Sequence, residues 1–139
     1  MNNPQEPKPT WLSHILARFR DPRSSPTFSI ICTPHQLSKT RSVKGNIEQE
    51  TVIAWQDIAY LLAYKRDLWA VDLICIEVGT CRGFAFEIDE EMDGWEVVVN
   101  RLPEYLPGCP AYADWWQVVA HPPFARNETQ LYPVDNKDE

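Results

Sequence analysis

The sequence predicts an α+β domain in which a curved antiparallel sheet of about six strands is capped by a C-terminal helix. Short apolar and β-branched stretches alternate with turn residues through the middle of the chain. Two of these stretches, 71–78 and 84–88, are separated by five residues with glycine at both ends, which is a hairpin pattern. An apolar stripe with helical spacing then follows: Trp95, Val98, Val99 and Leu102.

The first 26 residues are expected to be a disordered lead-in and a short amphipathic helix that precede a single domain at 27–134. Residues 1–9 contain three prolines and no apolar periodicity. Thr10 is a candidate N-cap, and the apolar residues after it share one helical face: Trp11, Leu12, Ile15, Leu16 and Phe19. Residues 135–139 form a charged tail.

The strands of the first half are predicted from their apolar pattern. Residues 27–33 are β-branched and aromatic, which favours a strand, and 47–55 alternate like a half-exposed strand. The polar and basic residues 37–46 between them are a loop or an edge hairpin. Residues 58–67 fit a helix or a strand, and apolar side chains at period two favour the strand: Ile58, Tyr60, Leu62 and Tyr64.

Two helices and a last strand are expected after the hairpin. Asp93 and Glu96 form a variant of the capping box at the start of the helix with the apolar stripe. Pro103 is expected to interrupt that helix, because proline removes a backbone hydrogen bond. A shorter helix over 111–119 and a last strand over 129–132 complete the prediction.

Composition indicates a cytoplasmic protein. The chain of 139 residues has no apolar run of 18 residues, so no membrane span is expected, and residues 1–9 do not have the pattern of a signal peptide. The four cysteines form no CxxC motif, which favours free thiols in a reducing compartment. They are Cys32, Cys75, Cys81 and Cys109.

The formal net charge of −7 is unevenly distributed along the chain. Residues 1–66 carry nine Lys or Arg against five Asp or Glu, whereas residues 67–139 carry four against fifteen. A protein that binds nucleic acid usually has a concentrated basic face, so no nucleic-acid partner is expected. The distribution fits an acidic surface that meets a basic partner, or charge complementarity between the two halves of the chain.

The candidate binding face is therefore an acidic run together with two aromatic residues expected to be exposed near it. The run consists of Glu87, Asp89, Glu90, Glu91 and Asp93, and the aromatic residues are Trp115 and Trp116. We expect a non-catalytic module that binds a protein partner, of the adaptor or immunity type. The alternative is a small-molecule or lipid-binding module with an aromatic pocket on the sheet, for which Trp55 with Trp69, or the Trp115 pair, are candidates. A homodimer formed through the helix at 10–20 is compatible with either function.

No cofactor, metal or catalytic set is expected. Asp89-x-Glu91-x-Asp93-Gly94 matches the first half of an EF-hand loop, but the twelfth position is Asn100 instead of a bidentate Glu. These carboxylates are better explained by the positive end of the helix that follows. Cys32 and His35 are close enough in sequence for a nucleophile and its base, but the signature of a cysteine hydrolase is missing. The three histidines have no zinc-binding spacing, and no phosphate-binding glycine loop occurs.

Short sequence segments at turns and element ends, spread over about residues 28–110, resemble those of small uncharacterised bacterial proteins with a PH-like architecture. The matching pieces are Trp55-Gln-Asp-Ile58, Lys65-x-Asp67, Asp72-Leu-Ile-Cys-Ile76, Phe86-Glu-Ile-Asp-Glu-Glu91, Gly94-Trp95 and Leu106-Pro-Gly108. The resemblance implies antiparallel strands, an acidic turn and a helix that ends in Leu-Pro-Gly. It also implies that the basic residues Lys39, Arg41 and Lys44 lie where a phosphoinositide-binding PH domain holds its headgroup. No catalytic residue follows from it.

Overall fold

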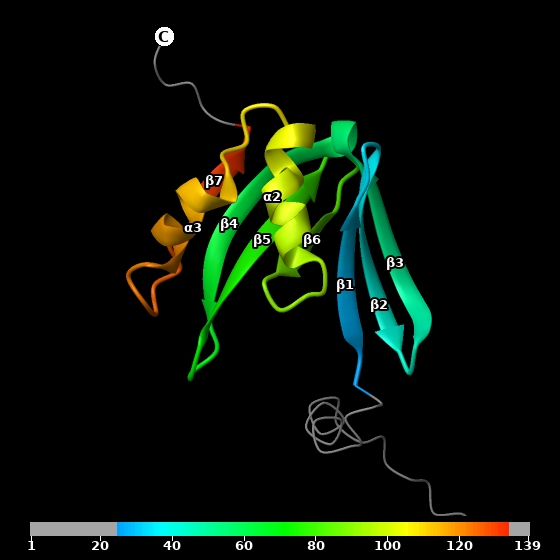
Figure 1. Cartoon of the computed structure of the whole chain (residues 1–139), viewed down its shortest axis with the longest axis horizontal. Coiled ribbons are helices and arrows are strands. Elements are labelled where there is room, and N and C mark those ends of the chain that lie inside the picture. Colours follow the sequence, from blue (N-terminus) through cyan, green and yellow to red (C-terminus); the bar gives the residue numbers. More distant parts are fainter. Residues whose placement is uncertain (1–24, 134–139) are drawn as a thin grey trace, which may run out of the picture.

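The computed structural model describes residues 25–133, which contain seven strands and two α-helices (Figure 1). The expected lead-in, the helix at 10–20 and the tail at 135–139 lie outside the described residues. The elements in chain order are β1 (Thr27–Cys32), β2 (Gln36–Val43), β3 (Asn46–Ala54), the 3-10 turn η2 (Trp55–Asp57), β4 (Ile58–Asp67), β5 (Asp72–Thr80), β6 (Ala85–Asp89), α2 (Trp95–Tyr105), α3 (Tyr112–Ala120) and β7 (Thr129–Tyr132).

The strands form two antiparallel sheets, so the prediction of one curved sheet of about six strands is wrong. Sheet A has the order β1-β2-β3, and sheet B has the order β6-β5-β4-β7. The chain changes sheet at η2, where the turn ends the β3 ladder and β4 pairs with β5 and β7 instead. Figure 1 shows sheet A, in blue and cyan, beside the green strands of sheet B.

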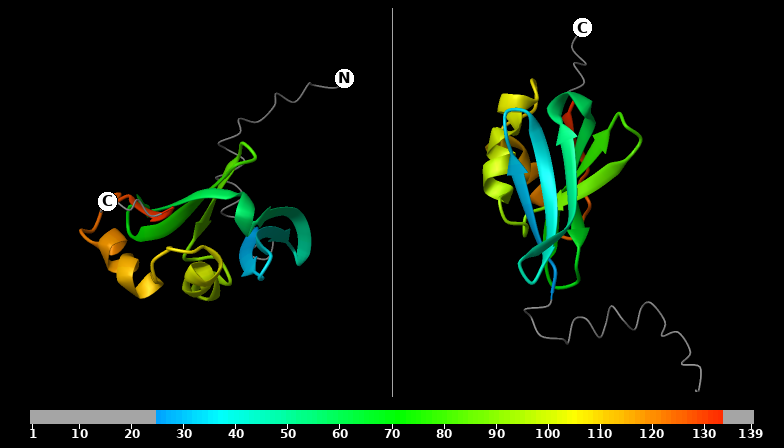
Figure 2. Two further views of the ribbon diagram at one scale, coloured as in Figure 1. Left: turned by 90° about the horizontal axis from the view of Figure 1, so that it is seen from above. Right: turned by 90° about the vertical axis from the view of Figure 1, so that its right-hand side faces the viewer.

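Both helices cover the same face of sheet B, as the view from above shows (Figure 2). The predicted stripe of α2 is confirmed, because Trp95, Val98, Val99 and Leu102 are all buried. They pack in one core with buried side chains from both sheets, among them Ile30, Ile53, Leu61, Ile76, Ile88 and Leu131. Helix α2 is not the last element, because α3 and β7 follow it.

Two expectations about the ends of α2 are wrong. The N-cap is Gly94, and no side chain caps the helix, so Asp93 and Glu96 do not form a capping box. The backbone N–H and carbonyl of Asp93 are bonded to β1 instead. Pro103 does not interrupt the helix, which continues to Tyr105. Proline removes one intrahelical hydrogen bond here, and the helix ends two residues later.

The strand prediction for residues 58–67 is confirmed, and so is the last strand. β4 is the central partner of sheet B, with β5 on one side and β7 on the other. The stretch at 37–46 is a hairpin, in which β2 pairs with β3 across a turn at Lys44 and Gly45. The shorter helix at 111–119 is also confirmed as α3, displaced by one residue.

The C-terminal segment is joined to sheet B by a buried lysine. Lys65, which is 4 % exposed, donates from Nζ to the carbonyl oxygens of Ala120 at 2.7 Å and Pro122 at 2.6 Å. The same ammonium lies 3.2 Å from Oδ2 of Asp72, and this oxygen also accepts the Phe124 N–H at 2.8 Å. A cation suits the end of α3, because the helix dipole is negative there.

Stability at acid pH is expected to depend on Asp72. The hydrogen bond from the Phe124 N–H, together with the Lys65 ammonium, lowers the pKa of Asp72 from its ordinary value against the opposing effect of burial. A carboxyl with a lowered folded-state pKa stabilises the fold above its unfolded pKa of about 3.9, and this contribution is lost as the pH falls through the folded value. Urea unfolding should therefore show a shallower loss of stability below about pH 4 for Asp72→Asn than for the wild type. Glu50→Gln, at an exposed residue of β3, is the control; parallel pH curves for Asp72→Asn and the wild type would refute the assignment.

Candidate functional site

The acidic loop between β6 and α2 is held in place by main-chain contacts to sheet B. Glu90 donates its N–H to the Ile74 carbonyl at 3.0 Å, and its Oε1 accepts the Ile74 N–H at 3.0 Å. Oδ1 of Asp89 accepts the Glu91 N–H at 3.0 Å, and Met92 donates its N–H to the Asp89 carbonyl at 3.1 Å. These hydrogen bonds fix the conformation of the loop.

The other end of the loop is bonded to the first strand. The Ile30 N–H donates to the Asp93 carbonyl at 2.8 Å, and the Asp93 N–H donates to the Phe28 carbonyl at 3.2 Å. Gly94 makes this approach feasible, because it has a φ of 92° and a Cβ here would lie 2.1 Å from the Ile30 carbonyl oxygen. A residue with a side chain meets both a strained backbone and a steric clash at this position.

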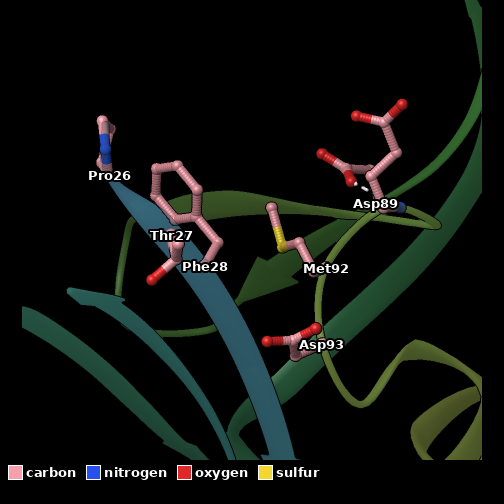
Figure 3. A pocket seen from close by; sticks show the side chains of 7 residues that line it. Pro26, Thr27, Phe28, Asp89, Met92 and Asp93 are labelled. Carbon is pink, nitrogen blue, oxygen red and sulfur yellow. Dashed lines mark hydrogen bonds between the residues drawn. The ribbon is translucent and has the colours of Figure 1, made fainter. Parts of the chain in front are cut away.

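A pocket of about 400 Å³ opens where the acidic loop meets the start of β1 (Figure 3). Three members of the predicted acidic run line it, namely Asp89, Glu91 and Asp93. The apolar part of its wall comes from residues outside the run: Pro26, Phe28 and Met92, with Thr27 beside them. The pocket thus combines carboxylates with an aromatic ring and a thioether.

A second hollow of about 420 Å³ continues from this pocket over the first turn of α2. It shares Glu91, Met92 and Asp93 with the pocket and adds Glu90, Gly94, Trp95, Glu96 and Val97. We call the two together the acidic groove. Within residues 25–133 no Lys, Arg or His lines it, and none of its five carboxylates is in an ion pair with a described residue.

Glu87, the remaining member of the acidic run, does not line the groove. Its Oε2 accepts a hydrogen bond from the Tyr64 hydroxyl, and its Oε1 lies 2.7 Å from Nη1 of Arg66. Burial, together with this hydrogen bond, raises the pKa of Tyr64, so the hydroxyl remains a donor at neutral pH. The charge of Glu87 is therefore paired within the protein, by Arg66, and the other four members of the run face the groove.

The expectation that Trp115 is exposed beside the acidic face is wrong. Trp115 is 3 % exposed and belongs to the core, where its ring meets Tyr112 edge-on at a centroid distance of 5.0 Å. Trp116 is half-buried against the same core. The amphipathic turn of α3 places Trp115 inward with Val119, so its ring cannot be a contact surface for a partner without unfolding.

Trp55 and Trp69 do not form a pocket together. Trp55 is buried and stacks on Tyr105 at 4.8 Å, whereas Trp69 is 95 % exposed in the turn between β4 and β5. The aromatic cleft that does exist, with a volume of about 360 Å³, lies at the end of the sheets. It is lined by Pro34, His35, Trp55, Gln56, Tyr105, Leu106, Pro107 and Tyr132.

Cys32 and His35 are not arranged as a nucleophile and its base. No hydrogen bond joins them in the described part of the chain; the backbone N–H of His35 donates to Oγ1 of Thr33 at 3.2 Å. Burial raises the pKa of Cys32, which disfavours the reactive thiolate. His35 is exposed at the aromatic cleft.

The acidic loop also does not group into a metal site. Among residues 25–133, no three His, Cys, Asp or Glu side chains are placed to hold a metal ion together.

No helix of the described region is long and apolar enough to cross a membrane.

The basic residues Lys39 and Arg41 lie with Phe28, Gln49, Thr51 and Phe86 in a small hollow between sheet A and β6. Lys39 donates from Nζ to the Glu87 carbonyl at 2.6 Å, and Arg41 is paired with Glu48. Burial lowers the pKa of Lys39, and the charges of Asp89 and Glu87 oppose this shift. Lys44 lies apart, in the turn after β2, so the three residues do not form one basic loop.

Sequence reasoning missed the groove's apolar wall and the buried lysine. Phe28 and Met92 belong to segments 64 residues apart, and only the pairing of the loop with β1 brings them together. The burial of Lys65 could have been predicted, because Leu61 and Ala63 precede it at period two on the buried face of β4.

Comparison of the chain with protein-family models, curated proteins and solved structures finds no match.

Proposed function

We propose that this protein is a non-catalytic interaction module that binds a basic protein partner through the acidic groove. The observation that carries the proposal is the composition of the pocket, in which Asp89, Glu91 and Asp93 surround an apolar wall of Phe28 and Met92. No charge of opposite sign from residues 25–133 lines this space. Unpaired carboxylates at a hollow surface favour association with a cationic group.

The pocket suits a lysine or arginine side chain of that partner. Such a side chain has an apolar stem and a charged head, so it can contact Phe28 and Met92 with one part and the carboxylates with the other. The loop is already held by Ile74 and by β1, and little conformational entropy is therefore lost on binding. This arrangement supports the interaction function over a catalytic one.

Neutralising the pocket is expected to abolish most of the binding. The variant Asp89→Asn/Glu91→Gln/Asp93→Asn removes three charges, while the amide oxygen introduced by Asp89→Asn can still accept the Glu91 N–H. An exposed charge pair contributes a few tenths to about 1 kcal/mol, so we expect a loss of roughly ten- to a hundredfold in affinity. The measurement is affinity capture from native extract at low and high salt, with bound proteins identified by mass spectrometry.

The control variant has the same net charge at other exposed positions: Glu50→Gln/Glu104→Gln/Asp114→Asn. It should retain the partner at low salt, and high salt should release the partner from the wild type. Equal losses from the two triple variants would refute the groove as the binding site. A blank capture at both salt concentrations would refute the interaction function and favour the alternative, a small molecule or lipid in the aromatic cleft.

Three further expectations are part of this proposal. The order of six antiparallel strands followed by α2 supports a PH-like relationship, although the sheets hold three and four strands. The four free cysteines support a cytoplasmic location, where thiols are kept reduced. A homodimer through the helix that the sequence predicts at 10–20 is the third expectation, and sedimentation equilibrium of the full chain tests it.

A further inference from the structure

Four exposed apolar residues lie in or beside the turn between β4 and β5. Their exposed fractions are 37 % for Leu68, 95 % for Trp69, 56 % for Val71 and 63 % for Phe124. Phe124 joins the group because its N–H is bonded to Asp72, which is opposite Asp67 at the end of the β4–β5 ladder. We call these four residues the aromatic tip. Solvent-facing patches of this kind mark interaction sites more often than isolated apolar residues do.

The aromatic tip has a defined conformation although its side chains are unpacked. The Trp69 N–H donates to Oδ1 of Asp67 at 2.9 Å, and the Leu68 N–H donates to the Val71 carbonyl at 2.9 Å. Trp69 and Phe124 have positive φ values of 72° and 61°, a backbone region that is costly for bulky residues. The turn thus holds the Trp69 side chain in solvent on a strained backbone.

The aromatic tip and the acidic groove lie at the same end of sheet B. Glu90 of the groove is bonded through both its N–H and its carboxylate to Ile74, which follows Asp72 by two residues. Figure 1 shows the β4–β5 turn and the loop between β6 and α2 at the lower end of the molecule. A partner that covers the groove can therefore reach the tip. The carboxylates nearby disfavour an anionic bilayer as the occupant.

We propose that the aromatic tip is the apolar anchor of the same interface, and that the basic partner has an apolar pocket beside its basic patch which receives Trp69. This inference rests on the proposed function. A central tryptophan flanked by polar contacts is the usual composition of an interface hot spot. Its pre-formed turn limits the entropy lost on binding.

The test uses the full chain with a photoreactive benzophenone amino acid in place of Val71, irradiated in native extract. We expect a protein adduct that is absent when the probe replaces Val118 of α3, which is equally exposed at 58 %. Adding Trp69→Ser should reduce the adduct at least about tenfold, since hot-spot tryptophans contribute about 2 kcal/mol or more. Phe84→Ser, in the turn at the opposite end of sheet B, should leave it within about twofold.

The neutralised groove variant separates this inference from the proposed function. The Val71 adduct should be lost in the Asp89→Asn/Glu91→Gln/Asp93→Asn background if one partner covers both surfaces. An adduct that persists there, or a groove-dependent capture with no Val71 adduct, would overturn the inference and leave the groove intact. Phosphatidylcholine vesicles or a second copy of the chain are the other occupants; Trp69-dependent cosedimentation with vesicles, or Trp69-dependent dimerisation, would also overturn it.

Discussion

Gly94→Ala is expected to lower the free energy of unfolding by about 3 kcal/mol. A left-handed backbone costs a residue with a Cβ about 1–3 kcal/mol. The Cβ would in addition lie 2.1 Å from the Ile30 carbonyl oxygen, so β1 and the acidic loop must separate. That movement breaks the two hydrogen bonds that Asp93 makes with β1, each with a net contribution of about 1 kcal/mol.

Gly83→Ala is the matched control, because Gly83 has nearly the same φ of 90° and no atom lies within 4 Å of the Cβ position. It should carry only the backbone cost, so urea unfolding of the two variants isolates the contact with β1. Equal destabilisation by the two substitutions would show that the close contact between the acidic loop and β1 does not contribute to stability as described. A lower partner affinity in Gly94→Ala than in Gly83→Ala would show that the hydrogen bonds between Asp93 and β1 support binding at the acidic groove.

Lys65→Met is expected to destabilise the protein by about 3–5 kcal/mol, which is the usual cost of removing one member of a buried ionic pair. The change removes the ammonium from the Asp72 carboxylate, which keeps only the Phe124 N–H as a donor, and from the carbonyls of Ala120 and Pro122. The region from the end of α3 to β7 should loosen first, and hydrogen exchange of the amides around Asn127 measures this directly. Lys44→Met, in the exposed turn after β2, should change the stability by less than about 0.5 kcal/mol.

A double-mutant cycle with Asp72→Asn tests the ionic part of this contact. Once Asp72 is neutral, the loss of Lys65 leaves no uncompensated buried charge, so Lys65→Met should cost less in the Asp72→Asn background than in the wild type. Additive effects would show that Lys65 acts through the carbonyls alone. A Lys65→Met protein as stable as the wild type would contradict the role given to this lysine.

Local patterns were sufficient for most of the elements. The strand at 58–67, the hairpin before β6 and the stripe of α2 follow from periodicity and turn residues, which reflect interactions within each segment. The division into two sheets depends on which strand β4 pairs with after η2, and that choice is made by contacts distant in sequence. The start of α2 likewise depends on a contact distant in sequence, because the backbone of Asp93 is hydrogen-bonded to β1.

The candidate site was predictable in charge but not in shape. Four of the five predicted carboxylates face the groove, whereas Glu87 on β6 is bonded to Tyr64 and paired with Arg66, both on β4 beyond the intervening β5. The prediction that Trp115 is exposed failed because a tryptophan occurs in the core as well as on the surface. Trp115 lies on the face of α3 that packs into the core. Among the described residues the exposed tryptophan is Trp69, which the sequence places between the charged residues Asp67 and Asp72.

The acidic groove as a protein-binding surface is tested most directly by cross-linking from within it. A benzophenone amino acid in place of Val97, which lines the groove and is 57 % exposed, is compared with the same probe in place of Val118, which is 58 % exposed on α3. Irradiation in native extract should give one adduct with a basic protein from position 97, lost at high salt and in the neutralised variant, and none from position 118. No adduct from position 97, or the same adducts from both positions, would contradict the account.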